Sequence, residues 1–471
     1  MPLPFHVSLV DRKDLSGEIY RQIRRAILDG HLRSGDQLPP VRELALSLSV
    51  SRMTVTVAYE RLAGEGFVSS RVGAGTFVSD ALIHGLKPAG VSPISVLQPR
   101  ACWKSIPLPT AFDDPAQFDF RTGLPDLSLF PHRAWRRLLG RASRTATNKY
   151  KHPAGDIGLR VAIAQHIGIS RSIRTSPNDI LVASGTQQVL DVVARTLLSP
   201  GDQIALEDPG YEPARQLFKS LGLDVLGVPV DREGIVVETL TPRTKAVYVT
   251  PSHQYPLGMP MALRRRQELL AWATHNAAAI IEDDYDSEFR FGGRPVEPLH
   301  TLDTAGCVIY VGSFSKTLQP DLRLAFLVAP PALVPALHRA KYVTDWYTPT
   351  ATQIALAEFI QAGEFARHIR KVGAAYKERH LILTDAIDRD FRGILERIPS
   401  HTGLHIAAFT PGRSAEQVAD ICIRAHQADV AVQHMSSFAV GTSVRAGLVL
   451  GYGAIAAGQI KEGLRRLKTC F

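Results

Sequence analysis

The sequence predicts a multi-domain protein in which a small helical domain with a β-hairpin precedes a much larger α/β domain. A chain of 471 residues is too long for one compact core. Helical periodicity in the first eighty residues also gives way to a proline-rich stretch, and then to strand-like apolar runs that alternate with helices. These changes place the first domain at residues 1–80, a linker at 81–116 and the second domain at 117–471.

Composition excludes several classes of protein. The net charge of +9 suits a nucleic-acid partner, but residues 1–80 hold ten Lys/Arg against nine Asp/Glu, so charge alone locates no DNA-binding region. The four cysteines are scattered without a CxxC pair, which predicts neither a disulfide framework nor a zinc site. We expect no signal peptide and no membrane span, and therefore a cytoplasmic protein.

Three helices are predicted in the first domain. The first covers about Leu15–Asp29, where apolar residues share one face and the arginines lie largely off it. After a proline-containing break, a short helix is expected over Val41–Leu48 and a third over about Arg52–Ala63. Helix, short turn and helix form the helix-turn-helix arrangement, whose second helix presents its N-terminal residues to the major groove of DNA.

A hairpin follows the third helix. Two short β-type runs, Phe67–Ser70 and Gly75–Val78, flank a glycine-containing turn and predict the wing of a winged helix. Arg71 and the glycines of this turn are placed to approach the phosphate backbone. The N-terminal stretch of the third helix, which would face the groove, holds Arg52, Met53, Thr54 and Thr56. The alternative is a small helical domain with solvated arginines, because short helix-turn-helix patterns are often false.

The proline-rich linker is expected to be a semi-rigid spacer. Beyond it, six β-rich runs alternate with helical stretches, which favours an α/β domain around a largely parallel sheet. These runs are Ile180–Ala183, Gln203–Leu206, Ala246–Thr250, Ala279–Glu282, Val308–Val311 and Ala325–Val328. A smaller α+β subdomain is predicted after about Tyr376, with Leu404–Phe409 as one of its strands.

A lysine and an aspartate, thirty-three positions apart, carry the strongest chemical signal. Lys316 ends the run Gly312–Lys316, and Asp283 lies in an acidic run after another predicted strand. A pyridoxal-phosphate (PLP) site needs an amine that condenses with the aldehyde and a carboxylate that keeps the pyridine nitrogen protonated. Taken singly, Lys316 would be an exposed lysine, and the acidic run would be a solvated turn or a carboxylate dyad. No metal site is expected, because no histidine lies nearby in the sequence.

Three further segments follow predicted strands. Ser184–Gln188 opens a helix, where exposed amides bind phosphate, although such a segment is also an ordinary helix cap. Tyr211 is an aromatic that either stacks on a pyridine ring or packs in the core. Thr250–Gly258 is rich in turn residues and either reaches the ring hydroxyl or forms a plain loop.

Two sets of segments resemble known families. LPPVRELA, SRMTVTVAYERLAGEGFV and RVGAGTFV resemble consecutive blocks of the GntR-type winged helix. By this resemblance Arg42 and Arg52 read bases or phosphates, whereas Tyr59 and Leu62 belong to the core. From about residue 117 to the end, the order and spacing of the strand-end signals resemble the class I (fold-type I) aminotransferases. The predicted fold is therefore an N-terminal winged helix-turn-helix plus a C-terminal α/β PLP-dependent transferase domain of fold-type I with a smaller α+β subdomain.

Carried over position by position, the aminotransferase resemblance implies roles for individual residues. Lys316 would form the Schiff base with PLP, and Asp283 would pair with the pyridinium nitrogen. Tyr285 would bond the ring hydroxyl, and Tyr211 would stack on the ring. The phosphate would be surrounded by Gly185, Thr186, Ser313, Ser315 and Arg323.

The combination of both domains resembles the MocR subfamily of bacterial transcriptional regulators, as do the segments FRTGLPDLSLFPHRAW, TPSHQYPLGMPM, IIEDDYDSEFRFGG and GSFSKTL. This resemblance implies promoter DNA as a partner, PLP and often an amino compound as effector, and a head-to-tail homodimer. Two positions depart from the enzymes: Tyr255 replaces the usual asparagine before Pro-x-Gly, and Arg445 is the only arginine available near the end for an effector carboxylate.

These departures favour a PLP-binding regulator that senses its effector without complete transamination. One alternative is an active PLP-dependent aminotransferase with a secondary DNA-binding domain. The other is a DNA-binding protein whose transferase-like half serves only for dimerisation.

Overall fold

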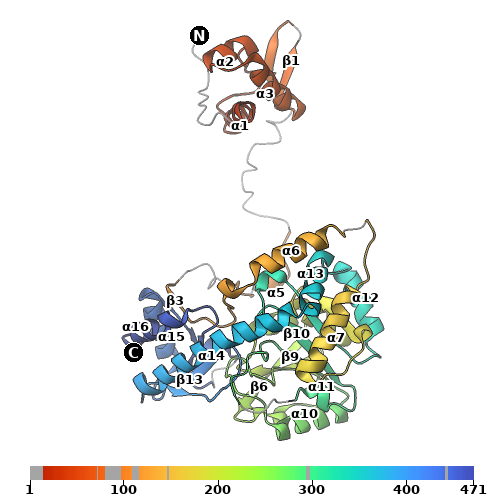
Figure 1. The fold of residues 1–471 in the computed structure, drawn as a ribbon, viewed down its shortest axis with the longest axis vertical. Coiled ribbons are helices and arrows are strands. Elements are labelled where there is room, and N and C mark those ends of the chain that lie inside the picture. Colours follow the sequence, from red (N-terminus) through yellow and green to blue (C-terminus); the bar gives the residue numbers. More distant parts are fainter. Residues whose placement is uncertain are drawn as a thin grey trace. The chain divides into compact units, whose positions relative to one another are not determined.

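The structure is a computed structural model, which describes residues 14–71, 73–79, 97–104, 106–108, 116–145, 148–292, 297–440 and 444–471. The chain divides into two compact units, Met1–Arg100 and Ala101–Phe471, each of which is drawn in Figure 1. Most of the predicted linker at 81–116 lies outside the described residues, as do Val72 of the hairpin turn and Ser443 near the C-terminus.

The first unit consists of three helices and a hairpin (Figure 1). Its elements are α1 (Leu15–Leu28), α2 (Val41–Ser47), α3 (Arg52–Gly64), β1 (Val68–Arg71) and β2 (Gly75–Val78). The two strands pair antiparallel with Val68 opposite Val78. The winged-helix prediction is confirmed, with helix ends within one or two residues of the expected positions.

Local sequence explains these helices. The apolar residues of α1 recur at helical spacing, so Ile19, Ile23 and Ile27 are all buried in one core. Ser51 begins α3, because its Oγ accepts a hydrogen bond from Thr54 N at 3.1 Å and so satisfies a free amide of the first turn. Tyr59 is buried, as predicted, and its hydroxyl donates to Pro39 O at 2.8 Å.

The second unit is built on an eight-stranded sheet in the order β4-β11-β10-β9-β8-β5-β6-β7. The strands are β4 (Ile180–Ala183), β5 (Gln203–Asp208), β6 (Asp224–Asp231), β7 (Gly234–Ile235), β8 (Thr244–Val249), β9 (Ala279–Asp284), β10 (Val308–Ser313) and β11 (Ala325–Val328). From β10 to β6 all neighbours are parallel, whereas β11 runs antiparallel to both β4 and β10. All six predicted strands are present. The sequence missed β6, whose Gly227 and Pro229 weaken the strand pattern, and the two-residue strand β7.

Helices cover both faces of this sheet. Leu181 faces a core that it shares with helices α8, α9 and α12, while the next residue, Val182, faces the opposite core beneath α6, α7 and α13. The helices are α5 (Ala101–Lys104), α6 (His132–Ser143), α7 (Ile157–Arg171), α8 (Thr186–Leu197), α9 (Glu212–Ser220), α10 (Leu263–His275), α11 (Leu299–Leu302), α12 (Val334–Asp345) and α13 (Thr350–Gln361). Short 3-10 turns lie at Leu127–Leu129, Pro177–Asp179, Val237–Thr239, Pro320–Leu322 and Met435–Phe438.

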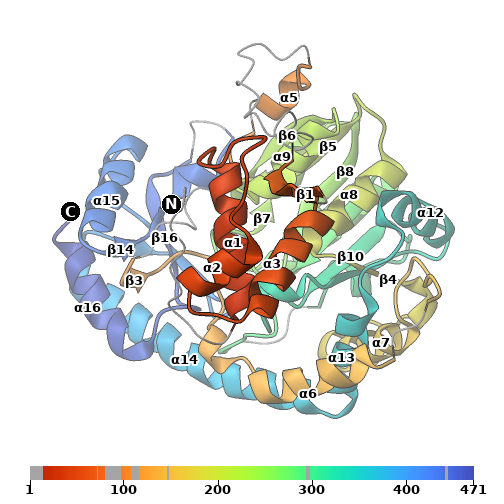
Figure 2. The ribbon, with the colours of Figure 1, turned by 90° about the horizontal axis from the view of Figure 1, so that it is seen from above.

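The remaining elements form a smaller α+β subdomain, gathered at one side of the second unit in Figure 2. Its antiparallel sheet has the order β12-β13-β16-β15. The elements are β3 (Phe118–Asp119), α14 (Glu364–Asp390), β12 (Glu396–Arg397), β13 (His405–Phe409), α15 (Ala415–Gln427), β14 (Val430–Ala431), β15 (Gln433–His434), β16 (Gly447–Gly451) and α16 (Ala457–Lys468).

The predicted strand at Leu404–Phe409 is present as β13. The predicted start after Tyr376 falls inside α14, so this helix runs through the expected boundary. The subdomain also takes β3 from the beginning of the unit, where it pairs parallel with β14. Within the described residues, no helix combines the length and the apolar character that crossing a membrane requires.

Candidate functional site

Two neighbouring parallel strands bring Asp283 and Lys316 to the same edge of the large sheet. Asp283 of β9 lies opposite Val311 of β10, and Lys316 follows three residues after β10 ends at Ser313. The carboxyl ends of parallel strands are where open α/β sheets bind their ligands. Asp286 and Asp283 both act on the amine of Lys316 as nearby negative charges.

The carboxylate of Asp283 is only half satisfied. Its side chain is 4% exposed, and Oδ2 accepts a hydrogen bond from Tyr248 OH at 2.7 Å. Its Oδ1 is buried and has no partner among the described residues. Burial therefore raises the pKa of Asp283 to about 7. A cationic N–H donor placed at Oδ1 would satisfy the atom and favour the ionised carboxylate, which is what a protonated pyridine ring offers.

Lys316 is held by a backbone carbonyl from the beginning of the unit. Its Nζ donates to Gly123 O at 2.7 Å. A Cβ at position 123 would lie 3.0 Å from Nζ, and Gly123 has a φ of +79°, so both space and backbone conformation favour glycine there. Burial lowers the pKa of the Lys316 amine, which increases the neutral, nucleophilic fraction.

A second corner of the site has the features of a phosphate cradle. Gly185 (φ +91°) precedes α8, which begins at Thr186 without a side-chain cap. Arg323 donates from Nη2 to Ser184 O at 2.9 Å, and a Cβ on Gly185 would lie 2.6 Å from that nitrogen. A guanidinium beside uncapped helix amides suits an anion. In the turn after β10, Ser313 Oγ accepts a hydrogen bond from Ser315 N at 3.1 Å.

The site also contains several tyrosines and a buried histidine. The sequence had predicted Tyr211 and Tyr285, but it had given no role to Tyr248 or His253. The ring of Tyr211 is stacked with Tyr248 at a centroid distance of 6.5 Å. Tyr285 OH donates to His253 O at 2.9 Å and lies 3.1 Å from His253 Nδ1. His253 Nδ1 in turn lies 3.0 Å from Asp286 Oδ2. Burial raises the pKa of Tyr285 well above its usual value, so its phenol stays protonated.

Although no histidine lies near the acidic run in the sequence, the fold brings His253 and His405 close to Asp286. His253, Asp286 and His405 are all buried, with ligand atoms within 4.8 Å of one another. Within this cluster His253 Nδ1 bonds Asp286 and His405 Nε2 lies 3.1 Å from Pro256 O, whereas His253 Nε2 is buried without a partner among the described residues. We interpret the bonded part of the cluster as a hydrogen-bond network behind Tyr285.

Arg445 is not brought together with these residues. Its side chain is 58% exposed, and Nη2 forms an ion pair with Glu396 Oε2 at 2.9 Å. The guanidinium also lies 3.8 Å from the centroid of the Phe409 ring. Among the described residues it contacts none of the groups around Lys316, so its placement does not support the predicted role in binding an effector carboxylate.

In the first unit, the predicted DNA-binding arginines are exposed and unpaired. Arg42 lies in the first turn of α2, Arg52 begins α3, and Arg71 ends β1 with its guanidinium 5.3 Å from the Phe77 ring. None of the three has an ion pair among the described residues. Three other arginines of the unit, Arg21, Arg25 and Arg61, pair with acidic side chains.

The two predicted threonines of α3 have local partners. The Thr54 hydroxyl lies 2.8 Å from Ser51 Oγ, and Thr56 Oγ1 donates to Arg52 O at 3.0 Å. A hydroxyl that already donates to the backbone can still accept a hydrogen bond. Met53, immediately before Thr54, is 70% exposed, so the start of α3 presents side chains to its surroundings.

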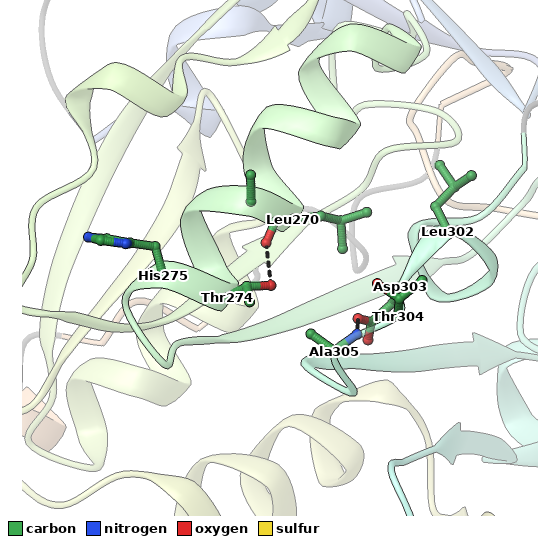
Figure 3. Close-up of a pocket in the computed structure, with 8 residues that line it drawn as sticks. Leu270, Thr274, His275, Leu302, Asp303, Thr304 and Ala305 are labelled. Atoms are coloured by element: carbon green, nitrogen blue, oxygen red, sulfur yellow. Dashed lines mark hydrogen bonds between the residues drawn. The ribbon is translucent and has the colours of Figure 1, made fainter.

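A surface pocket of about 460 Å³ lies elsewhere in the second unit, between the end of α10 and the loop after α11 (Figure 3). Its lining includes Thr274, His275 and Asp303, and none of the predicted site residues. The Asp303 carboxylate instead accepts backbone hydrogen bonds from its own loop, including one from Ala305 N at 2.8 Å. This pocket is separate from the constellation around Lys316.

Two family profiles match the chain. Residues 15–78 match "Bacterial regulatory proteins, gntR family", and residues 117–450 match "Aminotransferase class I and II". The chain is 36% identical to the probable rhizopine catabolism regulatory protein MocR of Rhizobium meliloti, over 96% of this chain and 93% of that protein. It is 32% identical to the pyridoxine biosynthesis transcriptional regulator PdxR of Corynebacterium glutamicum, over 96% of this chain and 95% of that protein.

A solved structure shares the fold of the second unit. The kynurenine aminotransferase of Pyrococcus horikoshii, described in complex with PMP, superposes with a TM-score of 0.69 at 28% identity. The match covers 75% of this chain and 90% of that one.

Proposed function

The chain belongs to the MocR subfamily of GntR-type transcriptional regulators, and we propose that it binds promoter DNA through its first unit and PLP through Lys316 in its second. It is a transcriptional regulator with an aminotransferase-like domain. The observation that carries the PLP proposal is the buried, unpartnered Oδ1 of Asp283 beside a lysine whose amine pKa is lowered. A homodimer working in the cytoplasm is part of the same proposal.

Each site residue has a task in this proposal. PLP supplies an aldehyde carbon at which amines exchange, and a ring that withdraws electrons when its nitrogen is protonated. Lys316 would provide the amine, Asp283 would pair with the ring nitrogen, and Tyr285 would form a hydrogen bond with the ring hydroxyl. Tyr211 covers a face of the ring. The phosphate is held at Gly185, Thr186, Ser313, Ser315 and Arg323.

The regulatory signal in this proposal is an amine effector. PLP would supply an aldehyde carbon at which an effector amine could exchange with the amine of Lys316, and the lysine side chain would then change its contacts around Gly123. Such a ligand shifts the protein between two conformations only by its differential affinity for them. The DNA contacts in this proposal come from Arg42, Arg52 and Arg71, supported by their exposure and by the lack of ion pairs among the described residues, together with Thr54 and Thr56 of α3.

Transamination is the alternative. Lys316 and Asp283 retain the amine and carboxylate that such enzymes need, so keto-acid release must be measured directly. Rapid multiple-turnover production of keto acid from an amino acid, without any change in DNA affinity, would favour an enzyme and contradict the sensor.

The test of the PLP site uses the full chain. Wild-type protein incubated with PLP should gain a visible absorption band, and borohydride should attach the cofactor irreversibly to the peptide that contains Lys316. Lys316→Ala should lose borohydride-dependent attachment while keeping its fold by circular dichroism. Covalent attachment to Lys316→Ala at wild-type yield would overturn the assignment.

A further inference from the structure

The small sheet turns one of its faces toward Lys316. Gln433 of β15 and Val449 of β16 lie directly opposite each other, so their side chains share a face. Gln433 Oε1 accepts hydrogen bonds from Thr122 N at 2.8 Å and Thr122 Oγ1 at 2.9 Å. Thr122 precedes Gly123, whose carbonyl oxygen holds Lys316 Nζ at 2.7 Å. This face is therefore one wall of the surroundings of the lysine amine.

The polar groups on this wall are uncharged. Tyr255 OH lies 2.8 Å from Thr122 Oγ1, and burial raises the pKa of Tyr255 to about 12, so the phenol keeps its proton at neutral pH. His405 packs beside Tyr255, and burial lowers the pKa of this imidazole well below its usual value, so it is neutral as well. The apolar cluster against which Tyr255 packs comprises Leu257, Ile398, Ala407, Met435, Phe438 and Val449.

The arginines next to this wall are already paired. Arg121, immediately before Thr122, donates from Nε to Asp119 Oδ1 at 2.9 Å, and both side chains are largely buried. Arg445, just before β16, pairs with Glu396. The carboxyl groups of Asp286 and Asp283 partly oppose the lowering of the Lys316 pKa by burial, so both act on this amine. A carboxylate bound at this wall would face the carboxyl groups of Asp283 and Asp286, and the two arginines next to the wall are already paired with acids. Burying an unpaired carboxylate is costly.

We infer that the effector is a primary amine whose other groups are uncharged, either hydroxylated or apolar, rather than an α-amino acid. The effector amine would be attracted by the aldehyde carbon of PLP and by the carboxyl groups of Asp283 and Asp286. Hydroxyl groups match the Gln433–Thr122–Tyr255 hydrogen-bond network, and carbon surface matches the Phe438–Val449 cluster. This inference rests on the proposed function, because it concerns the same site.

The experiment uses pairs of ligands that differ only in the carboxylate. PLP-loaded full-length protein is titrated with L-serine and with 2-amino-1,3-propanediol, and separately with L-alanine and with (S)-2-aminopropan-1-ol. The visible spectrum and the affinity for a DNA duplex, selected from a random pool by the wild-type protein, are measured together. We expect the amino alcohol of each pair to act at a concentration at least tenfold lower. Equal or tighter action of the amino acids would overturn the inference.

A matched pair of variants tests the wall itself. Gln433→Arg places a cation on the sheet face that bonds Thr122, and should shift the preference toward L-serine by tenfold or more. Gln433→Met removes the same hydrogen bonds without adding charge, and should show no such shift. An unchanged preference in a Gln433→Arg protein that keeps its PLP band would place the effector away from this wall. The wild-type ligand pairs decide the question if this variant does not fold.

Failure of the proposed function gives a different result. Wild-type protein without a PLP band contradicts the cofactor proposal. If no amine or amino acid alters the PLP band, the proposal that the protein senses an amine effector is contradicted. The inference about the chemical class of the effector is then contradicted as well. A response to both members of each pair at equal concentration leaves the sensor intact and overturns only the effector class.

Discussion

At Asp283, one carboxylate oxygen accepts a hydrogen bond from Tyr248, and the other has no partner in the described part of the chain. Leaving a buried acceptor unsatisfied costs about 1–3 kcal/mol, more for a charged group. The unsatisfied oxygen destabilises the end of β9, and a ligand that donates a hydrogen bond to it would remove this destabilisation. The site is thus less stable without its ligand than its packing alone would allow.

Asp283→Asn should weaken PLP binding by roughly tenfold or more, because a hydrogen bond to a charged group is worth about 1.5–3 kcal/mol. The asparagine keeps the shape of the side chain and can still accept from Tyr248, so folding should survive. Titration of the visible band measures the affinity. Wild-type affinity in this variant would remove Asp283 from the ring nitrogen.

The same variant should be more stable than wild type in the PLP-free state, in a pH-dependent way. The folded pKa of Asp283 is about 7, above the value of about 3.9 expected when unfolded, so ionisation opposes folding as pH rises. The melting-temperature advantage of Asp283→Asn should grow from about pH 4 to pH 7 and then level off. An advantage that stays constant with pH would contradict the burial of an ionisable carboxylate.

At the scale of single elements, the first unit separates its arginines into two groups. Arg21 and Arg25 of α1 and Arg61 near the end of α3 form ion pairs with nearby acidic side chains. Those at the start of α2, at the start of α3 and at the end of β1 have no such pair in the part of the chain that the structure describes. The net charge of this region is nearly zero, so its positive potential depends on where the unpaired arginines lie.

Arg42→Ala and Arg52→Ala should each weaken binding to the selected duplex, by about 1–3 kcal/mol for a lost base contact. A lost phosphate contact should instead reduce the salt dependence of binding by about one unit of slope. Arg25→Ala is the matched control, because Arg25 is 83% exposed but paired with Asp29. Fluorescence anisotropy at several salt concentrations measures both effects. Equal losses in all three variants would indicate only a general effect of charge.

At the scale of the whole molecule, the two units have separate hydrophobic cores. Among the residues that the structure describes, one core contains only residues between Ile19 and Val78, and the others contain only residues from Phe118 onward. Cores that share no side chain can unfold independently.

Calorimetry of the full chain should therefore show two transitions. PLP should raise only the transition of the second unit and the DNA duplex only that of the first, each by about 2.7 kcal/mol when the ligand is at 100 times its Kd. The Lys316→Ala and Arg52→Ala variants should each lose one of these effects and keep the other. A single transition that both ligands raise would mean that the chain unfolds as one cooperative unit.

The sequence by itself determined the elements. Apolar periodicity specified the helices of the first unit, and short apolar runs specified six strands of the large sheet, because both patterns depend on neighbours a few residues apart. The sequence also located the ends of the strands near which Asp283, Lys316 and Gly185 lie. It failed at β6, where glycine and proline interrupt the pattern, and at the start of the small subdomain, to which β3 contributes from far away in the chain.

Only the tertiary structure decided which of these residues meet. Gly123 holds Lys316 across 193 positions, and Thr122 reaches Gln433 across 311. Likewise Arg445, which the sequence offered for an effector carboxylate, pairs with Glu396, because β12 and β16 both lie next to β13. Such contacts follow from the order in which strands assemble, and strand order is set by the packing of the whole domain rather than by any local stretch of sequence.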